Sequence, residues 1–105
     1  MSDYFDDMVS SFYNELLTMR EKADFYSKWG KSEGRKSIWT CKNGTKVRIM
    51  DMTDSHLNNT IKMLESKDPK HEALRYLKYE SFYRFRYQNL LNEIDKYEHI
   101  ENVCF

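Results

Sequence analysis

A regular stripe of apolar residues through the first 28 residues constrains the fold of this chain more than any other feature. Successive members are four and three residues apart in alternation, which is a heptad seam over three repeats. The pattern predicts a helix over residues 1–29, and Gly30 is suited to end it. The stripe consists of Phe5, Val9, Phe12, Leu16, Met19, Ala23 and Tyr26.

The pattern changes to alternating β-branched and aromatic residues over residues 37–50. Asn43-Gly44 at the centre favours a two-residue type I′ turn, since both central residues of that turn need positive φ. We therefore predict a β-hairpin, with Ile38 and Thr40 on one face of the first strand and Val47 and Ile49 on one face of the second. An isolated hairpin is marginal in water, so its apolar face must lie on a helix or on a partner chain.

Two further helices are predicted after the hairpin. Thr53 is a suitable N-cap for a short helix over residues 53–66, and Asp68-Pro69 has the sequence of a cap and first turn for a long helix over residues 69–99. The apolar seam of this long helix is interrupted by Glu80. The seam consists of Tyr76, Tyr83, Tyr87, Leu90, Ile94 and Tyr97.

The fold class predicted by these elements is mainly α (α+β), a single domain over residues 1–105 in the order α-β-β-α-α. The two long helices carry coiled-coil spacing, and they pair either with each other or with a second copy of the chain. We expect a homo-oligomer, because a chain of 105 residues has a thin core.

Composition excludes several classes of protein. The 17 basic residues balance the 17 acidic ones, which argues against a globally basic nucleic-acid binder and against a disordered polyelectrolyte. No apolar run is long enough to span a bilayer, and the acidic start is unlike a signal peptide, so we expect a cytoplasmic protein without a membrane partner. Cys41 and Cys104 form no metal-ligand motif; free thiols are expected, and a disulfide between them is the alternative.

The neutral total conceals a segregation of charge. Residues 20–49 hold nine basic and three acidic residues, whereas residues 1–19 hold four acidic residues and no basic one. Arginines and lysines alternate with aromatic residues over residues 75–87, an arrangement that suits phosphate contact and base stacking. The competing interpretation is that the tyrosines border the core and the cations face solvent. As contacts to a partner we select Trp39, Arg48, Tyr83, Arg84 and Arg86.

His56 and two carboxylates, Asp51 and Asp54, form the other candidate site, at the start of the short helix. They are interpreted as contacts to a ligand or partner, with structural capping as the competing interpretation. Their spacing matches no established metal motif, and the chain contains no GxSxG, P-loop or GxGxxG sequence. We therefore predict no catalytic residues, no metal and no cofactor; a small hydrolase using His56 is the weakest alternative.

One segment resembles a pattern found in small, mostly uncharacterised bacteriophage proteins. The resemblance covers residues 39–61 and rests on Trp39-Thr40, Gly44, Val47, Ile49, Asp51-Met52, His56-Leu57, Asn59 and Ile61. It implies a viral protein that works in the cytoplasm of an infected bacterial host, often against host machinery or host defence. No residue role comes with it.

The hypothesis from sequence is therefore a non-catalytic bacteriophage protein with an anti-defence or inhibitory role. Its partner is a host (bacterial) protein or a nucleotide-like anionic ligand that it sequesters. The alternative is a phage regulator that binds nucleic acid.

Overall fold

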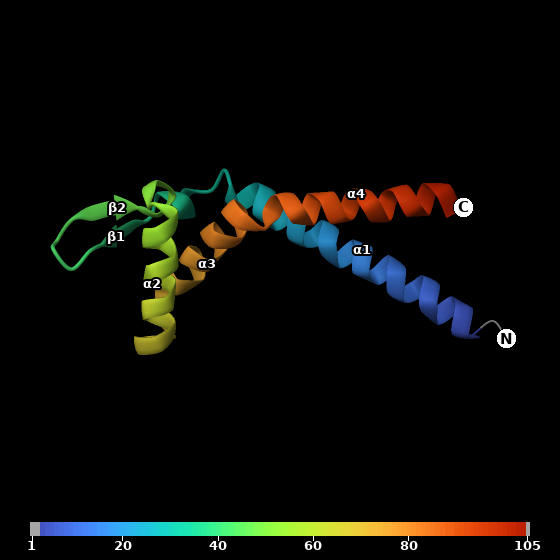
Figure 1. The fold of residues 1–105 in the computed structure, drawn as a ribbon, viewed down its shortest axis with the longest axis horizontal. Coiled ribbons are helices and arrows are strands. Elements are labelled where there is room, and N and C mark those ends of the chain that lie inside the picture. The colour runs from blue at the N-terminus through green and yellow to red at the C-terminus, as the bar shows by residue number, and fades with distance from the viewer. Residues whose placement is uncertain (1–2, 105) are drawn as a thin grey trace.

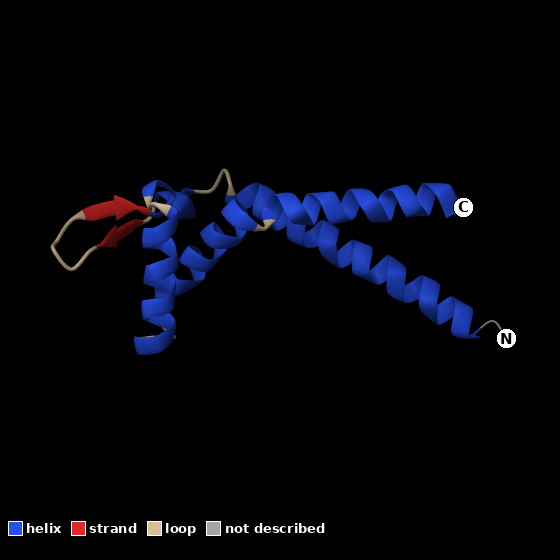
Figure 2. Cartoon of the chain, in the orientation of Figure 1, coloured by secondary structure: helices blue, strands red, loops and turns tan. Residues whose placement is uncertain are grey.

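The computed structural model describes the backbone of residues 3–104 and the side chains of residues 14–99. Most of this part is helical, with one small antiparallel hairpin, as predicted (Figures 1 and 2). Its principal extents are 65 × 25 × 21 Å, with the hairpin at one end and both termini at the other. The elements are α1 (Asp3–Trp29), the 3₁₀ turn η1 (Glu33–Lys36), β1 (Ile38–Thr40), β2 (Lys46–Arg48), the 3₁₀ turn η2 (Ile49–Asp51), α2 (Asp54–Lys67), α3 (Glu72–Phe85) and α4 (Tyr87–Cys104).

The prediction of one long helix over residues 69–99 was wrong at its start and in its middle. His71 is the N-cap, and its Nδ1 accepts a hydrogen bond from the Ala73 N–H at 3.0 Å. Pro69 lies instead in a turn closed by the bond from the His71 N–H to the Asp68 carbonyl. Arg86, with φ −125° and ψ −17°, separates α3 from α4. The observed order is therefore α-β-β-α-α-α.

The break at Arg86 has a tertiary cause, since neither glycine nor proline lies near it in the sequence. The chain changes direction there, so that α3 packs on α2 while α4 packs on α1 (Figure 1). One straight helix would not reach both partners. A local sequence pattern contains no sign of such a bend.

The hairpin forms where expected, but with a different turn. Only Gly44 has positive φ, at 87°, so the type I′ turn predicted for Asn43-Gly44 is absent. The Gly44 N–H donates to the Cys41 carbonyl and the Cys41 N–H to the Thr45 carbonyl. This is a three-residue loop that ends in a left-handed glycine. The Thr45 N–H also donates to Asn43 Oδ1 at 3.0 Å, which stabilises the loop.

This loop sets the strand register and thereby decides which face of the hairpin is buried. Trp39 pairs with Val47, and both pack on the core, whereas Ile38 is 56% exposed. A two-residue turn would have placed Trp39 opposite Arg48, because a shift of register by one residue reverses the faces. The hairpin does lie on a helical layer, as its marginal stability requires.

Two clusters of buried apolar side chains hold the chain together. The hairpin-end core joins η2, α2 and α3 and consists of Ile49, Met52, Leu57, Leu64, Leu74 and Leu77. The helix-pair core joins α1 and α4 and consists of Leu16, Met19 and Leu90, with partly buried neighbours around them. Thus α1 and α4 pair within one chain, one of the two arrangements left open by the heptad pattern. The seam residues Phe5, Val9 and Phe12 lie outside the described side chains.

No helix in the described part of the chain has the length and hydropathy needed to cross a membrane.

Candidate functional site

Glu80, which interrupts the predicted seam, is the centre of a buried ionic network. Its side chain is fully buried and accepts hydrogen bonds from Arg35 Nε at 2.7 Å, Arg84 Nε at 2.7 Å and Trp29 Nε1 at 3.1 Å. Burial by itself raises the pKa of Glu80, but the bonds from Arg35, Arg84 and Trp29 outweigh it and lower the pKa. Glu80 is therefore ionised, and it joins α3 to α1 and η1.

Arg84 uses all five of its N–H donors inside the chain. Nε binds Glu80, and the two terminal nitrogens bind Asp54 Oδ1 and the carbonyls of Met52, Ile49 and Met50, at 2.8–3.3 Å. A guanidinium group has only five such donors, so none remains for a ligand. Arg84 thus holds η2 and the start of α2 against α3, a task that the sequence pattern did not indicate.

The predicted carboxylates are likewise occupied by arginines. Asp51 Oδ2 lies 2.6 Å from Arg48 Nε, and both side chains are about half exposed. Asp54 pairs with Arg84, while Thr53 caps α2 by accepting the His56 N–H at 3.1 Å. The structure therefore brings Arg48, Asp51, Asp54 and Arg84 together around η2. No cluster of three or more metal-ligating side chains exists among the described residues.

His56 meets a residue that the sequence analysis did not pair with it. Its Nε2 lies 3.8 Å from Sγ of Cys41, which follows β1. Cys41 is a free thiol. The alternative of a disulfide between Cys41 and Cys104 involves a side chain outside the described ones, although the hairpin and the end of α4 lie at opposite ends of the molecule (Figure 1).

Trp39 and Tyr83 serve the packing of the fold. Trp39 is half buried on the hairpin-end core, with its ring centroid 5.7 Å from that of His71. Tyr83 stacks on Tyr87 at 5.6 Å, and the Arg35 guanidinium lies 4.9 Å from its ring centroid. The interpretation of Tyr83 as a residue bordering the core describes its contacts fully.

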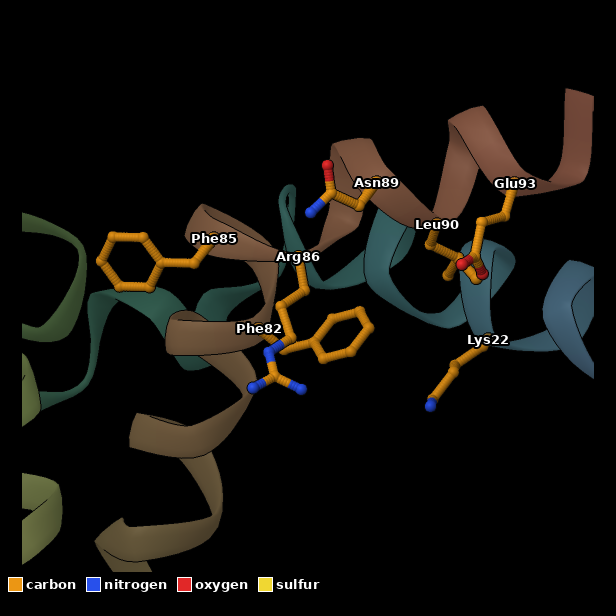
Figure 3. A pocket seen from close by; sticks show the side chains of 7 residues that line it. All are labelled: Lys22, Phe82, Phe85, Arg86, Asn89, Leu90 and Glu93. Carbon is orange, nitrogen blue, oxygen red and sulfur yellow. The ribbon is translucent and has the colours of Figure 1, made fainter.

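Arg86 lies apart from the other predicted residues, at the junction between α3 and α4. Arg84 is largely buried in the Glu80 network, whereas Arg86 is exposed at the end of α3. Arg86 is exposed and has no ion pair within the described residues. It lines two hollows of about 430 and 340 Å³ that share Arg86 and Phe82. Figure 3 shows Arg86 beside Phe82, with Lys22 of α1 across the hollow.

Arg86 is the last member of a stripe that we call the basic face of α3. Successive members are three or four residues apart, so they share one side of the helix over ~22 Å. A third hollow, of about 310 Å³, continues the stripe toward the start of α3, so Lys78 lines two of the three. The basic face comprises His71, Arg75, Lys78, Phe82 and Arg86.

Two aromatic rings on and beside this face, Phe82 and Tyr76, are each in contact with an aromatic ring and with a cation. Phe82 stacks on Tyr26 at 4.2 Å, and Lys22 Nζ lies 5.2 Å from its centroid. Tyr76 stacks on Trp29, and the Arg75 guanidinium lies 5.1 Å from its ring. The face therefore offers charge and shape, while Phe85, which is 44% exposed and lines the hollow beside Arg86, is a ring in this region that remains accessible.

Sequence reasoning missed His71, Arg75 and Lys78 because it followed the alternation of Arg and Tyr along the chain rather than helical spacing. The signal that identifies them is the interval of three or four residues between positions 71 and 86. Arg84 does not fit this spacing, because it lies two residues before Arg86. A helical projection of residues 71–86 would have divided the cations into a buried set and an exposed set.

Comparison of the chain with models of protein families, with curated proteins and with solved structures gives no match in any of the three.

Proposed function

We propose that this chain is a non-catalytic bacteriophage protein that binds an acidic surface of a bacterial host protein with the basic face of α3. The observation that carries the proposal is the exposed row of Arg75, Lys78 and Arg86. Only Lys78 of these has an ion-pair partner among the described residues, Glu65 at 3.1 Å. Complementary charge speeds association and fixes the register of two surfaces.

The shape of the face favours a protein over a single nucleotide. The hollows are shallow and follow the helix for ~22 Å, a length comparable to several turns of a partner helix. Two rings of this region are already stacked on aromatic residues of α1, Phe82 on Tyr26 and Tyr76 on Trp29, whereas Phe85 remains exposed. A nucleic acid would therefore find few rings on which its bases could stack, and for that reason it ranks below a host protein.

A nucleotide-like anion is the second candidate, because the hollow between α1 and the α3–α4 junction has a suitable size. Its volume is about 430 Å³, and Lys22, Arg86 and Asn89 line it together with one carboxylate, Glu93. Small-molecule sites begin at about 300 Å³. Sequestration of such an anion would also inhibit a host process without catalysis.

The place of action that we propose is the cytoplasm of an infected bacterium. The support is the resemblance over residues 39–61 to small bacteriophage proteins. Within this segment, Arg84 holds η2 and the start of α2. An inhibitory or anti-defence role is the form of action that suits a binding surface without a catalytic cluster.

We also propose that the protein forms a homo-oligomer through α1 and α4. The two helices pack near the centre of the molecule and diverge toward the termini (Figure 1). The heptad seam of α1 continues into the diverging part, and a second copy is the partner that would complete it. Sedimentation velocity over a hundredfold range of concentration tests this: a single monomeric species throughout would disprove the proposal.

The binding proposal is tested with two triple variants of matched charge change. Arg75→Glu, Lys78→Glu and Arg86→Glu together reverse the basic face. Lys31→Glu, Lys46→Glu and Lys96→Glu reverse three exposed cations that line none of the hollows. Each tagged protein is purified from infected cells with and without nuclease treatment and is analysed by native mass spectrometry.

We expect a host protein to be retained by the wild type and the control triple and lost by the face triple. Its binding should weaken with salt, because exposed charges are screened. Retention of a small ultraviolet-absorbing anion instead would favour the nucleotide candidate. Loss of binding on nuclease treatment would favour nucleic acid, and equal retention by both triples would overturn the basic face as the site.

A further inference from the structure

The contact between Cys41 and His56 joins two elements whose backbones are both fixed. Cys41 is held in the hairpin loop, since its N–H donates to Thr45 at 2.8 Å and its carbonyl accepts from Gly44 at 2.9 Å. His56 is held in the first turn of α2, where its carbonyl accepts the Thr60 hydroxyl at 2.8 Å. The fold therefore fixes both backbones, and Sγ and Nε2 lie 3.8 Å apart.

No carboxylate among the described residues is paired with the His56 imidazole. The two carboxylates nearest in sequence, Asp51 and Asp54, are each bound to an arginine, Arg48 and Arg84. Both carboxylates are therefore paired with arginines and not with His56. The hairpin supplies two exposed cations, Lys42 and Lys46, which favour an approaching anion.

Cys41 is also reachable from solvent. Cys41 and His56 are both half buried, so the pair is sheltered without being enclosed. A half-buried thiol beside an imidazole has the setting of a reactive cysteine rather than of a core cysteine.

We propose that Cys41 is a site of thiol–disulfide exchange with small anionic disulfides of the glutathione class, and that His56 is its general base. His56 Nε2 takes the proton from Cys41 Sγ, and the thiolate attacks one sulfur of the disulfide. The sulfur–sulfur bond breaks as the mixed disulfide forms, and the leaving thiolate takes the proton from His56. No net oxidation occurs, because one disulfide is exchanged for another.

This site is separate from the basic face of α3, so its test is independent of the function proposed above. Modification of Cys41 would add a negatively charged group beside the N-terminus of α2, and it would be reversed by any reducing thiol.

The experiment measures the rate at which oxidised glutathione modifies the protein at pH 7, followed by intact-protein mass spectrometry. Every protein carries Cys104→Ser, so that Cys41 alone reacts. His56→Ala is compared with wild type and with His99→Ala, which removes an exposed histidine of α4 far from the hairpin. His56→Gln is the second variant, and circular dichroism checks that each protein is folded.

We expect His56→Ala and His56→Gln to react at least about tenfold more slowly than wild type, while His99→Ala matches it. The difference in reaction rate between wild type and the His56 variants should become smaller at alkaline pH, because a thiol ionises there without a general base. The proposal is overturned if folded His56→Gln reacts within twofold of wild type, or if native Cys41 reacts no faster than Cys41 in the unfolded chain.

Discussion

The two ends of the molecule differ in how they are held together. At the hairpin end, six buried apolar residues and the Glu80 network lock η2, α2 and α3. At the other end, three buried residues join α1 to α4. Yet the second end carries the more regular heptad pattern in sequence. Regular heptad spacing therefore predicts the helices well. The number of buried side chains in a core depends instead on how many helices and turns pack together there.

The largest expected effect comes from removing the charge at the centre of the hairpin end. Glu80→Gln keeps the size of the side chain but leaves Arg35 and Arg84 without their anion in a buried setting. Breaking a buried ion pair in this way costs about 3–5 kcal/mol. Urea unfolding followed by circular dichroism measures the loss of unfolding free energy.

Glu65→Gln is the matched control, because Glu65 also pairs with a cation, Lys78, but is 49% exposed. Its expected cost is at most about 1 kcal/mol. If Glu80→Gln costs no more than Glu65→Gln, the network does not stabilise the hairpin end and the contrast between the two ends is wrong.

The next effect compares the two apolar clusters directly. Leu57 is completely buried in the hairpin-end core, and Leu90 is 7% exposed in the helix-pair core. Leu57→Ala should lower the unfolding free energy by about 2–5 kcal/mol, and Leu90→Ala should fall near the lower limit of that range.

Hydrogen exchange sharpens this comparison, because it resolves where each variant opens. Leu90→Ala should speed exchange in α4 and in the part of α1 that faces it, while α2 and α3 keep the wild-type rates. Leu57→Ala should speed exchange in α2 and α3. Equal acceleration at both ends in both variants would mean that the chain opens as one unit.

Acid should weaken the hairpin end before it weakens the helix pair. Because the pKa of Glu80 is lowered in the folded chain, its ionised form stabilises the fold at pH values above the ordinary glutamate range. That contribution falls as the pH drops below the unfolded value, about 4.3, and is lost once the folded pKa is passed. Thermal unfolding between pH 7 and 3 should show a smaller acid-induced decrease in Tm for Glu80→Gln than for wild type.

The helical fold class, the hairpin and the cap at Thr53 follow from local sequence, since each depends on residues close in the chain. The break at Arg86 does not, because α1 and α2 together impose it. The turn at Gly44 was predicted with the wrong type, since Asn43-Gly44 fits both a two-residue and a three-residue loop. Only the pairing of Trp39 with Val47 over the core distinguishes them.

The candidate sites show the same division. Arg86 was selected from sequence and lies on an exposed basic face. Arg84 was selected by the same argument, but all of its donors bind within the chain, to Glu80 and the η2 carbonyls among others. The role of Glu80 depends on Arg35, 45 residues away in the chain. No local pattern contains a contact between residues so far apart.

The smallest expected effect tests whether ion pairs compensate for the thin helix-pair core. Arg20 Nη2 of α1 lies 2.9 Å from Glu98 Oε1 of α4, with the side chains 42% and 44% exposed. Since water screens such a pair, a double-mutant cycle with Arg20→Ala and Glu98→Ala should give a coupling of about 0.2–1 kcal/mol, and less at high salt. Lys28 and Asp24, paired within α1, provide the control cycle. A coupling above about 2 kcal/mol that survives high salt would show that charge, rather than Leu16 and Leu90, holds α4 to α1, and would remove the contrast between the two ends.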